Sequence, residues 1–201
     1  MALPMRHVYR AAARDRALTP DEIRQFLRAM QTSNLRHQFK IAFQLILMTL
    51  VRKSELMLAQ WKDVHLDDGE WHIPVENSKT GKPHIVCLST QAQTLFKELK
   101  ALASSSVWVL PGRGILAKPF ASNALNQALK ASLQGQEIPA FTIHDLRRTA
   151  STKLHKQGWP SDVVEKALNT PSAACAASTI GPGTPNSGGK WYRRGRTTST
   201  G

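Results

Sequence analysis

Apolar residues recur at helical spacing through the central part of the chain. Four side chains make up the first run: Ile23, Phe26, Leu27 and Met30. Their spacing predicts an amphipathic helix. Thr19 caps this helix, Pro20 is its first helical residue, and Glu22 supplies the second half of a capping box. Residues 35–51 are apolar almost all round toward their end, which predicts a second helix central to the core.

Two shorter segments, 70–75 and 84–88, are predicted to be strands. Residues 78–82 between them have the glycine and polar content of a hairpin turn. Further helices are predicted over four ranges: 90–101, 121–133, 145–157 and 161–168. Gly158 ends the third of these, and Pro160 precedes the fourth. The pattern therefore predicts a mainly α chain with a small antiparallel β-sheet at one side, an α+β fold.

Composition divides the chain into three segments. Residues 1–17 are basic and weakly patterned, which predicts a flexible arm. Residues 18–169 carry the periodic segments and are expected to form one domain. Residues 170–201 contain no Asp or Glu, and 23 of these 32 residues are Gly, Ala, Pro, Ser or Thr. We therefore expect a disordered basic tail.

The charge balance narrows the class of partner. The formal net charge is +13, which favours polyanions, either nucleic acid or an anionic membrane surface. The longest apolar run is too short to span a bilayer, and the first residues lack the apolar stretch of a signal peptide. Cys87 and Cys175 have no metal-ligand spacing and form no disulfide framework. We expect a cytoplasmic protein that binds DNA or RNA.

Two cations stand at positions where chemistry is possible. Arg52 ends the very apolar second helix, and a guanidinium there is costly unless it meets an anion. It either forms a salt bridge with Glu55 or another carboxylate, or clamps a phosphate, whose oxygens its planar fork matches. Lys79 lies at the tip of the predicted hairpin. It is either simply solvated or a general acid, a role for which Lys82 is a rival.

The densest cluster of polar side chains is residues 144–149. If a helix begins near His144, then His144 and Arg147 share one face. An imidazole beside a guanidinium suits a phosphoryl transition state, because one group moves a proton and the other holds charge. The structural alternative is that His144 caps the helix and Arg147 pairs with Asp145. Asp145 itself is better explained as a helix-start residue than as a catalytic base.

Three stretches in order resemble one family: 49–67 (TLVRKSELMLAQWKDVHLD), 70–89 (EWHIPVENSKTGKPHIVCLS) and 139–169 (PAFTIHDLRRTASTKLHKQGWPSDVVEKALN). Over residues 18–169 the chain resembles phage-type integrases of the tyrosine recombinase family. The resemblance implies a mainly helical catalytic domain with a small β-sheet flank. It implies cleavage of double-stranded DNA through a tyrosine nucleophile and a 3′-phosphotyrosyl link, with no metal or nucleotide cofactor.

The resemblance also assigns roles to single residues. Arg52 matches the first catalytic arginine, which binds the scissile phosphate, and Glu55 matches the acidic residue that supports it. Lys79 matches the hairpin lysine, the proton donor to the leaving 5′-hydroxyl. His144 and Arg147 match the HxxR pair, an acid/base group and the second phosphate clamp.

The chain departs from the family after residue 169. Thr170 stands where a further histidine is expected, and Thr179 stands where the nucleophilic tyrosine is expected. The chain's two tyrosines, Tyr9 and Tyr192, lie at other positions. The amino-terminal arm-binding and core-binding domains of a full-length integrase have no counterpart in this sequence.

A one-base shift in reading frame accounts for the departure. With suitable synonymous codons from Thr170 onward and one borrowed C, the adjacent frame reads HPKRGVRGVYN over 170–180. Further on it reads EQRRKMVQAWADYID over about 185–199. These strings place the histidine over Thr170, the tyrosine over Thr179 and an amphipathic helix after them. We therefore expect a frameshift after Asn169.

Several functions are compatible with these observations. The first is a DNA-binding remnant of a recombinase, inactive because its nucleophile is missing. The second is an active recombinase that uses Tyr192 or a tyrosine donated in trans by another integrase protomer. The third is a non-enzymatic DNA-binding module that interferes with intact integrase. An RNA-binding protein is disfavoured, because the aromatic stacking strands of such modules are missing.

Overall fold

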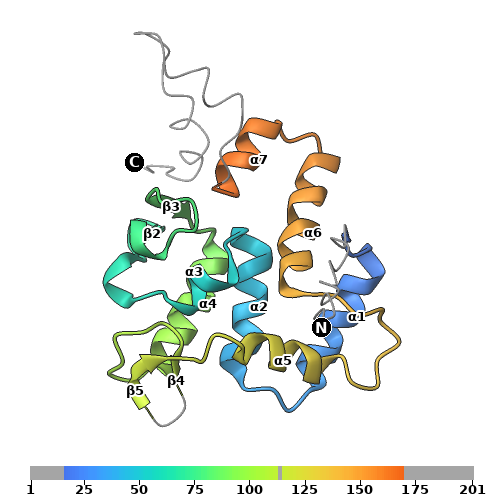
Figure 1. Cartoon of the computed structure of the whole chain (residues 1–201), viewed down its shortest axis with the longest axis horizontal. Coiled ribbons are helices and arrows are strands. Elements are labelled where there is room, and N and C mark those ends of the chain that lie inside the picture. The colour runs from blue at the N-terminus through green and yellow to red at the C-terminus, as the bar shows by residue number, and fades with distance from the viewer. Residues whose placement is uncertain (1–15, 113–114, 170–201) are drawn as a thin grey trace, which may run out of the picture.

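The computed structural model describes residues 16–112 and 115–169. Helices dominate this part of the chain (Figure 1), and they have the following bounds: α1 Pro20–Thr32, α2 His37–Thr49, α3 Lys53–Met57, α4 Thr90–Leu102, α5 Ala124–Ser132, α6 Ile143–Lys156 and α7 Ser161–Ala167. The predicted helices are all present, with ends that differ by a few residues. None of the described helices combines the length and the apolar character needed to cross a membrane.

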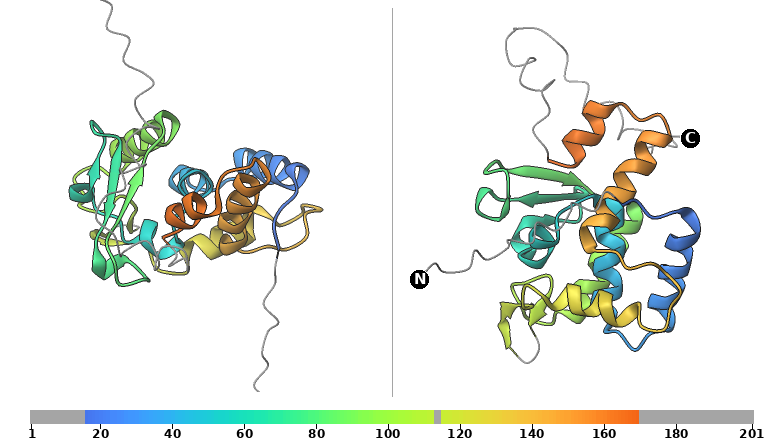
Figure 2. Two further views of the ribbon diagram at one scale, coloured as in Figure 1. Left: turned by 90° about the horizontal axis from the view of Figure 1, so that it is seen from above. Right: turned by 45° about the vertical axis from the view of Figure 1, so that its right-hand side comes forward.

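A three-stranded antiparallel sheet flanks the helices. Its strands are β1 (Val64–His65), β2 (Glu70–Ile73) and β3 (His84–Cys87), in that order across the sheet. The predicted pairing of the two longer strands is confirmed, with Trp71 opposite Val86. Figure 2 shows this sheet and α1 on opposite sides of the molecule, with α2 and α6 between them. The α+β fold class is as expected.

Short elements were not predicted. The α3 helix has five residues, and β1 has two, so neither is long enough to show a hydrophobic period. A second hairpin, β4 (Pro111–Gly112) and β5 (Ile115–Pro119), lies between α4 and α5. The predicted turn at 78–82 is also longer in the structure. A 3₁₀ helix at Val75–Asn77 precedes it, so the connection spans residues 74–83.

The core forms around α2, as its apolar sequence predicts. Five of its apolar side chains are fully buried: Ile41, Ala42, Phe43, Leu45 and Ile46. The helix packs against α4 on one side and α6 on another. This central position holds the carboxyl end of α2 beside α6, and that is where the candidate site lies.

Polar caps fix where the outer helices begin. The predicted capping box at the start of α1 is confirmed, since the Thr19 hydroxyl accepts from the Glu22 N–H at 3.2 Å and Glu22 accepts from the Thr19 N–H at 2.8 Å. The Leu18 N–H donates to the Thr149 hydroxyl at 2.9 Å, which ties this end of α1 to α6. Arg16 donates to the carbonyls of Pro139 and Ala140 at 2.6 Å. Residues 1–15 and 170–201, which include most of the expected arm and the whole expected tail, lie outside the described residues.

Thr142 caps α6, the helix that carries His144 and Arg147. Its hydroxyl accepts from the Asp145 N–H at 3.3 Å, and Asp145 accepts from the Thr142 N–H at 2.7 Å. We expect Thr142→Ala to lower the free energy of unfolding by about 1 kcal/mol, the usual cost of losing such a cap. Urea titration followed by circular dichroism measures this. The exposed Lys153→Ala on the same helix is the control and should stay within about 0.5 kcal/mol of the natural chain.

Candidate functional site

The junction between α2 and α3 places Arg52. The α2 helix stops at Leu50, whose backbone is left-handed with φ of 56°, and α3 begins after Arg52, its N-cap residue. Glu55 lies one turn into α3 and is only 2% exposed. Its carboxylate accepts from the Arg52 backbone N–H at 2.6 Å and from Nη1 of the Arg52 side chain at 2.9 Å. The backbone and the guanidinium of Arg52 are therefore both held by one buried acid.

The ion pair with Glu55 leaves part of the Arg52 guanidinium available for another hydrogen bond. Its second terminal nitrogen, Nη2, reaches the Asn169 carbonyl at 3.3 Å, at the far end of the described chain. The salt bridge that the sequence analysis offered as the structural explanation of Arg52 is therefore present. It leaves one edge of the guanidinium directed at an oxygen acceptor, so the salt bridge and a phosphate-binding role are compatible.

Arg147 lies on α6 and is buried, with 7% of its surface exposed. Its Nε donates to the Leu50 carbonyl and its Nη2 donates to the Leu168 carbonyl. Burial, together with the positive charge of Arg52, lowers the pKa of Arg147 to about 10, while Glu55 and Glu165 oppose the shift. Arg147 therefore keeps its charge at neutral pH, in a position shielded from water.

The Arg147–Asp145 pair suggested by their spacing is not the one that forms. Asp145 is instead the second half of the capping box at the start of α6, where it accepts from the N–H and the hydroxyl of Thr142. The interpretation of Asp145 as a helix-start residue is confirmed. Arg147, on the inner face of the helix, is left to bind backbone carbonyls.

Both arginines meet at the carboxyl-terminal end of α7. The Leu168 and Asn169 carbonyls are adjacent in the chain, and one is bound by Arg147 and the other by Arg52. The last carbonyls of a helix lack helical partners and carry partial negative charge. Two guanidiniums that gather such oxygens form a site that suits an anion with several oxygens, such as a phosphate.

The β2–β3 loop is tethered to the same end of α7. Asn169 donates through Nδ2 to the Ser78 hydroxyl at 3.1 Å, and Ser78 hydrogen-bonds to the Thr80 hydroxyl at 2.9 Å. Lys79 lies between these two residues and is exposed, as is Lys82. The contacts therefore place the loop beside the arginines, while the part that either lysine amine takes stays a prediction.

His144 occupies the first turn of α6. The alternative that it caps this helix is wrong, because Thr142 is the cap. His144 and Arg147 are three positions apart on this helix, but His144 is exposed whereas Arg147 is buried. Its role as an acid/base group stays a prediction. Thr170, Thr179, Tyr9 and Tyr192 lie outside the described residues.

The sequence analysis missed His84, the first residue of β3. Its pKa is lowered by burial, with Arg147 and Arg52 adding to the shift, while Glu55 and the Ala167 carbonyl oppose it. One signal was available in the sequence. Side chains alternate along a strand, and His84 shares a face with the buried Val86.

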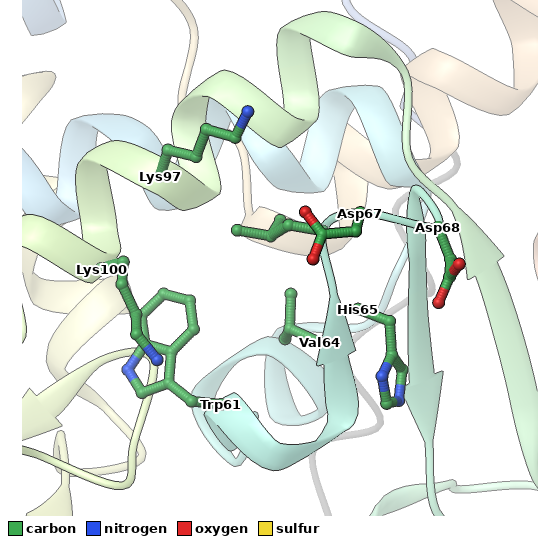
Figure 3. Close-up of a pocket in the computed structure, with 8 residues that line it drawn as sticks. Trp61, Val64, His65, Asp67, Asp68, Lys97 and Lys100 are labelled. Carbon is green, nitrogen blue, oxygen red and sulfur yellow. The ribbon is translucent and has the colours of Figure 1, made fainter.

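A separate pocket of about 390 Å³ lies between α4 and the segment that carries β1 (Figure 3). Asp67, Asp68, Lys97 and Lys100 are among its lining residues, and Lys100 lies 4.6 Å from the centre of the Trp61 ring. Because carboxylates line this pocket together with the lysines, it is less suited to an anion than the arginine cluster. Within the described ranges, no group of three or more His, Cys, Asp or Glu residues is placed to hold a metal ion.

The family model, the curated relative and the two solved structures described below are all integrases. The model of the phage integrase family matches residues 16–174. Prophage integrase IntA of Escherichia coli (strain K12) is 32% identical over 153 residues, which make up 76% of this chain and 36% of that protein. The chain thus spans well under half the length of this curated relative.

Two solved structures share the fold. Tn1549 transposon integrase in complex with transposon right end DNA aligns with a TM-score of 0.67 at 14% identity, over 84% of this chain and 62% of that one. A lambda integrase dimer bound to a COC′ core site aligns with a TM-score of 0.60 at 22% identity, over 80% of this chain and 57% of that one.

Proposed function

Because the chain belongs to the phage integrase family, we propose that residues 18–169 are the incomplete catalytic domain of a tyrosine recombinase. In this proposal the protein binds double-stranded DNA and does not cleave it. Membership of this family implies that the chain derives from a protein of DNA recombination. The observation that carries the proposal is the meeting of Arg52 and Arg147 at two adjacent oxygens.

The two arginines would bind the scissile phosphate. Each guanidinium presents several N–H donors in a plane, which matches the oxygens of a phosphodiester and the charge that develops in a phosphoryl transition state. Glu55 would keep Arg52 in position through the two hydrogen bonds that it accepts. His144 would serve as acid/base group, and Lys79 would give a proton to the leaving 5′-hydroxyl.

The missing part is the nucleophile. Thr179 is a poor substitute for a phenol, because its secondary hydroxyl is crowded and has a far higher pKa. Tyr192 would have to enter the site from a glycine-rich segment, which forfeits most of the rate gain from positioning. The expected frameshift after Asn169 explains both the missing tyrosine and the missing histidine at Thr170.

Two other functions stay open to test. An active recombinase could use Tyr192 or receive a tyrosine from another protomer, and the lambda integrase neighbour is a dimer on DNA. A non-enzymatic module could occupy DNA sites and interfere with intact integrase. Covalent trapping of DNA separates the active enzyme from the other two.

DNA binding tests the proposed site directly. We expect weak binding whose logarithm falls with the logarithm of salt concentration, with a slope of about −0.9 for each phosphate contact. Arg52→Ala and Arg147→Ala should each weaken binding and reduce the size of that slope by about 1. Fluorescence anisotropy with a labelled duplex, titrated at several salt concentrations, measures both quantities.

Arg28→Ala is the matched control. Arg28 is an exposed residue of α1, so its loss changes the net charge equally without touching the cluster. If Arg28→Ala weakens binding as much as Arg52→Ala and Arg147→Ala, then the overall charge binds the DNA and the proposed site is wrong. Arg147→Lys should also bind less well, because a lysine cannot present two parallel donors.

A further inference from the structure

Asn169 closes the end of α7 and contacts two other parts of the candidate site. Its backbone is left-handed, with φ of 47°, and its N–H donates to the Lys166 carbonyl at 3.0 Å. Asparagine tolerates this conformation better than most residues, and a left-handed residue is a common way to end a helix. The Asn169 carbonyl accepts from Nη2 of Arg52 at 3.3 Å, and its side-chain Nδ2 donates to the Ser78 hydroxyl at 3.1 Å. One residue therefore links the first arginine to the β2–β3 loop.

Ser78 holds together the part of the β2–β3 loop that Asn169 contacts. It is buried, with 8% of its surface exposed. Its N–H donates to the Val75 carbonyl and its carbonyl accepts from the Gly81 N–H, each at 3.1 Å. Its hydroxyl also hydrogen-bonds to the Thr80 hydroxyl at 2.9 Å. The hydrogen bond from Asn169 therefore fixes the loop at a residue that contacts the chain on both sides of it.

The same loop carries two exposed cations, Lys79 and Lys82. A loop without a fixed position must be ordered when its cations contact a partner, and the conformational freedom that it loses lowers the affinity. A loop that is already held in the free protein avoids most of that cost. The link between Asn169 and Ser78 holds the loop beside Arg52 in this way.

We infer that Asn169 is a positioning residue of the phosphate site, which holds the β2–β3 loop beside Arg52 so that the cations of the loop lie next to the bound DNA backbone. The inference rests on the proposed function, because it adds a positioning residue to the same site. Asn169 acts through Ser78 and Arg52, and not by binding the phosphate itself.

Asn169→Gly separates this role from the capping of α7. Glycine adopts a φ of 47° without strain and is the residue most often found at such a helix end. The variant therefore keeps the turn and the carbonyl that Arg52 binds, and it removes the amide that binds Ser78. Ser78→Ala removes the same hydrogen bond from the other side.

A double-mutant cycle on DNA binding tests the link. Fluorescence anisotropy with a labelled duplex gives the Kd of the natural chain, of Asn169→Gly, of Ser78→Ala and of the double variant. We expect each single variant to raise the Kd by about threefold to tenfold, the effect of one hydrogen bond. The double variant should bind no more weakly than either single one, because both changes remove the same bond. Val75→Ala, at a residue of the same loop with 49% of its surface exposed, is the control and should bind like the natural chain.

The salt dependence of binding separates positioning from a loss of folded protein. A smaller folded fraction lowers the affinity by the same factor at every salt concentration and keeps the slope. We expect the slope of Asn169→Gly to be smaller in size by about 1, because a loose loop loses a phosphate contact. A lower affinity with an unchanged slope overturns the inference.

Hydrogen exchange of the full chain, followed by nuclear magnetic resonance, gives a readout without DNA. The amides of Ser78 and Gly81 should exchange about threefold to tenfold faster in Asn169→Gly, while the amides within β2 and β3 keep their rates. A residue that only caps α7 would not change the exchange of a loop about 90 positions earlier in the chain. Unchanged exchange at Ser78 and Gly81 contradicts the inference.

The arginine variants distinguish a failure of this inference from a failure of the proposed function. If Arg52→Ala and Arg147→Ala weaken binding but Asn169→Gly and Ser78→Ala leave the affinity unchanged, then the proposed function stands and Asn169 is only a helix cap. Losses that add up in the double variant also overturn the inference, because the two residues then act separately. If neither arginine variant binds DNA less well than Arg28→Ala, the proposed function and this inference both fail.

Discussion

Replacing residues 170–199 with the sequence of the adjacent reading frame is expected to give a protein that forms a covalent adduct with nicked DNA, whereas the natural chain forms none. The replacement contains Thr170→His and Thr179→Tyr and adds an amphipathic helix after them. In the expected step the new phenol loses its proton as its oxygen bonds to phosphorus, and the bond from phosphorus to the 5′-oxygen breaks. The 5′-oxygen takes up a proton and leaves as the 5′-hydroxyl. The product is a 3′-phosphotyrosyl link.

The effect is expected to be large because the remaining groups can act only on a positioned nucleophile. Fixing a reactant next to its target is worth an effective concentration of about 10⁵–10⁸ M. In the proposed mechanism Arg52 and Arg147 would stabilise the developing charge, but without a nucleophile there is no barrier for them to lower. The end of α7 already touches both arginines, so a segment that continues from Asn169 starts at the site.

A denaturing gel measures the adduct, with a pool of nicked duplexes as suicide substrates. Two control variants are made in the restored protein. One carries Thr179→Phe in place of Thr179→Tyr, and the other combines the restored segment with Arg147→Ala in α6. Both should leave the DNA unmodified. An adduct formed by the natural chain and lost in Tyr192→Phe would contradict the proposal and favour an active enzyme that uses Tyr192.

Trp71→Ala is expected to lower the free energy of unfolding by about 3–5 kcal/mol, the usual cost of emptying a large buried aromatic site. Trp71 lies on β2, is 1% exposed and contacts the Phe96 ring of α4 at a centroid distance of 5.7 Å. It therefore attaches the sheet to the helices. The sheet also carries the β2–β3 loop, whose Ser78 accepts a hydrogen bond from Asn169 beside the arginines, so the variant should also weaken DNA binding.

Ile85→Ala is the matched control for this prediction. Ile85 lies on the neighbouring strand β3, with 54% of its surface exposed on the other face of the sheet. Its substitution should change stability by less than about 0.5 kcal/mol. Urea unfolding of both variants, followed by circular dichroism, makes the comparison. If both variants lose the same free energy of unfolding, then packing of the inner face does not attach the sheet to the helices.

The parts of the fold that could be predicted are those whose sequence signal lies within a single helix or hairpin. The apolar sequence of residues 35–51 indicated the central helix, and Thr19 with Glu22 indicated the start of α1 through a local capping box. The strands at 70–73 and 84–87 followed from their composition and the turn between them. Each of these signals depends on residues only a few positions apart, which a single sequence displays directly.

The site was predictable in its residue types and less so in its contacts. The Arg52–Glu55 pair lies within one turn and was anticipated. Arg147 binds carbonyls of Leu50 and Leu168, which belong to two other helix ends, and no local pattern reveals such partners. His84 could have been found from the alternation along its strand, but its neighbours on α3, α6 and α7 come from tertiary packing alone.

The left-handed backbone at Leu50 sets a trade-off for anyone who would engineer a more stable version of this protein. A non-glycine residue in that conformation costs about 1–2 kcal/mol, and stabilising designs usually begin by relieving such strain with glycine. Here the Leu50 side chain is buried and its carbonyl holds Arg147. Glycine would empty a packed position, enlarge the unfolded ensemble and loosen the oxygen that aims the arginine. The backbone energy stored at this position is therefore coupled to the geometry of the site, and optimisation for stability should leave Leu50 unchanged.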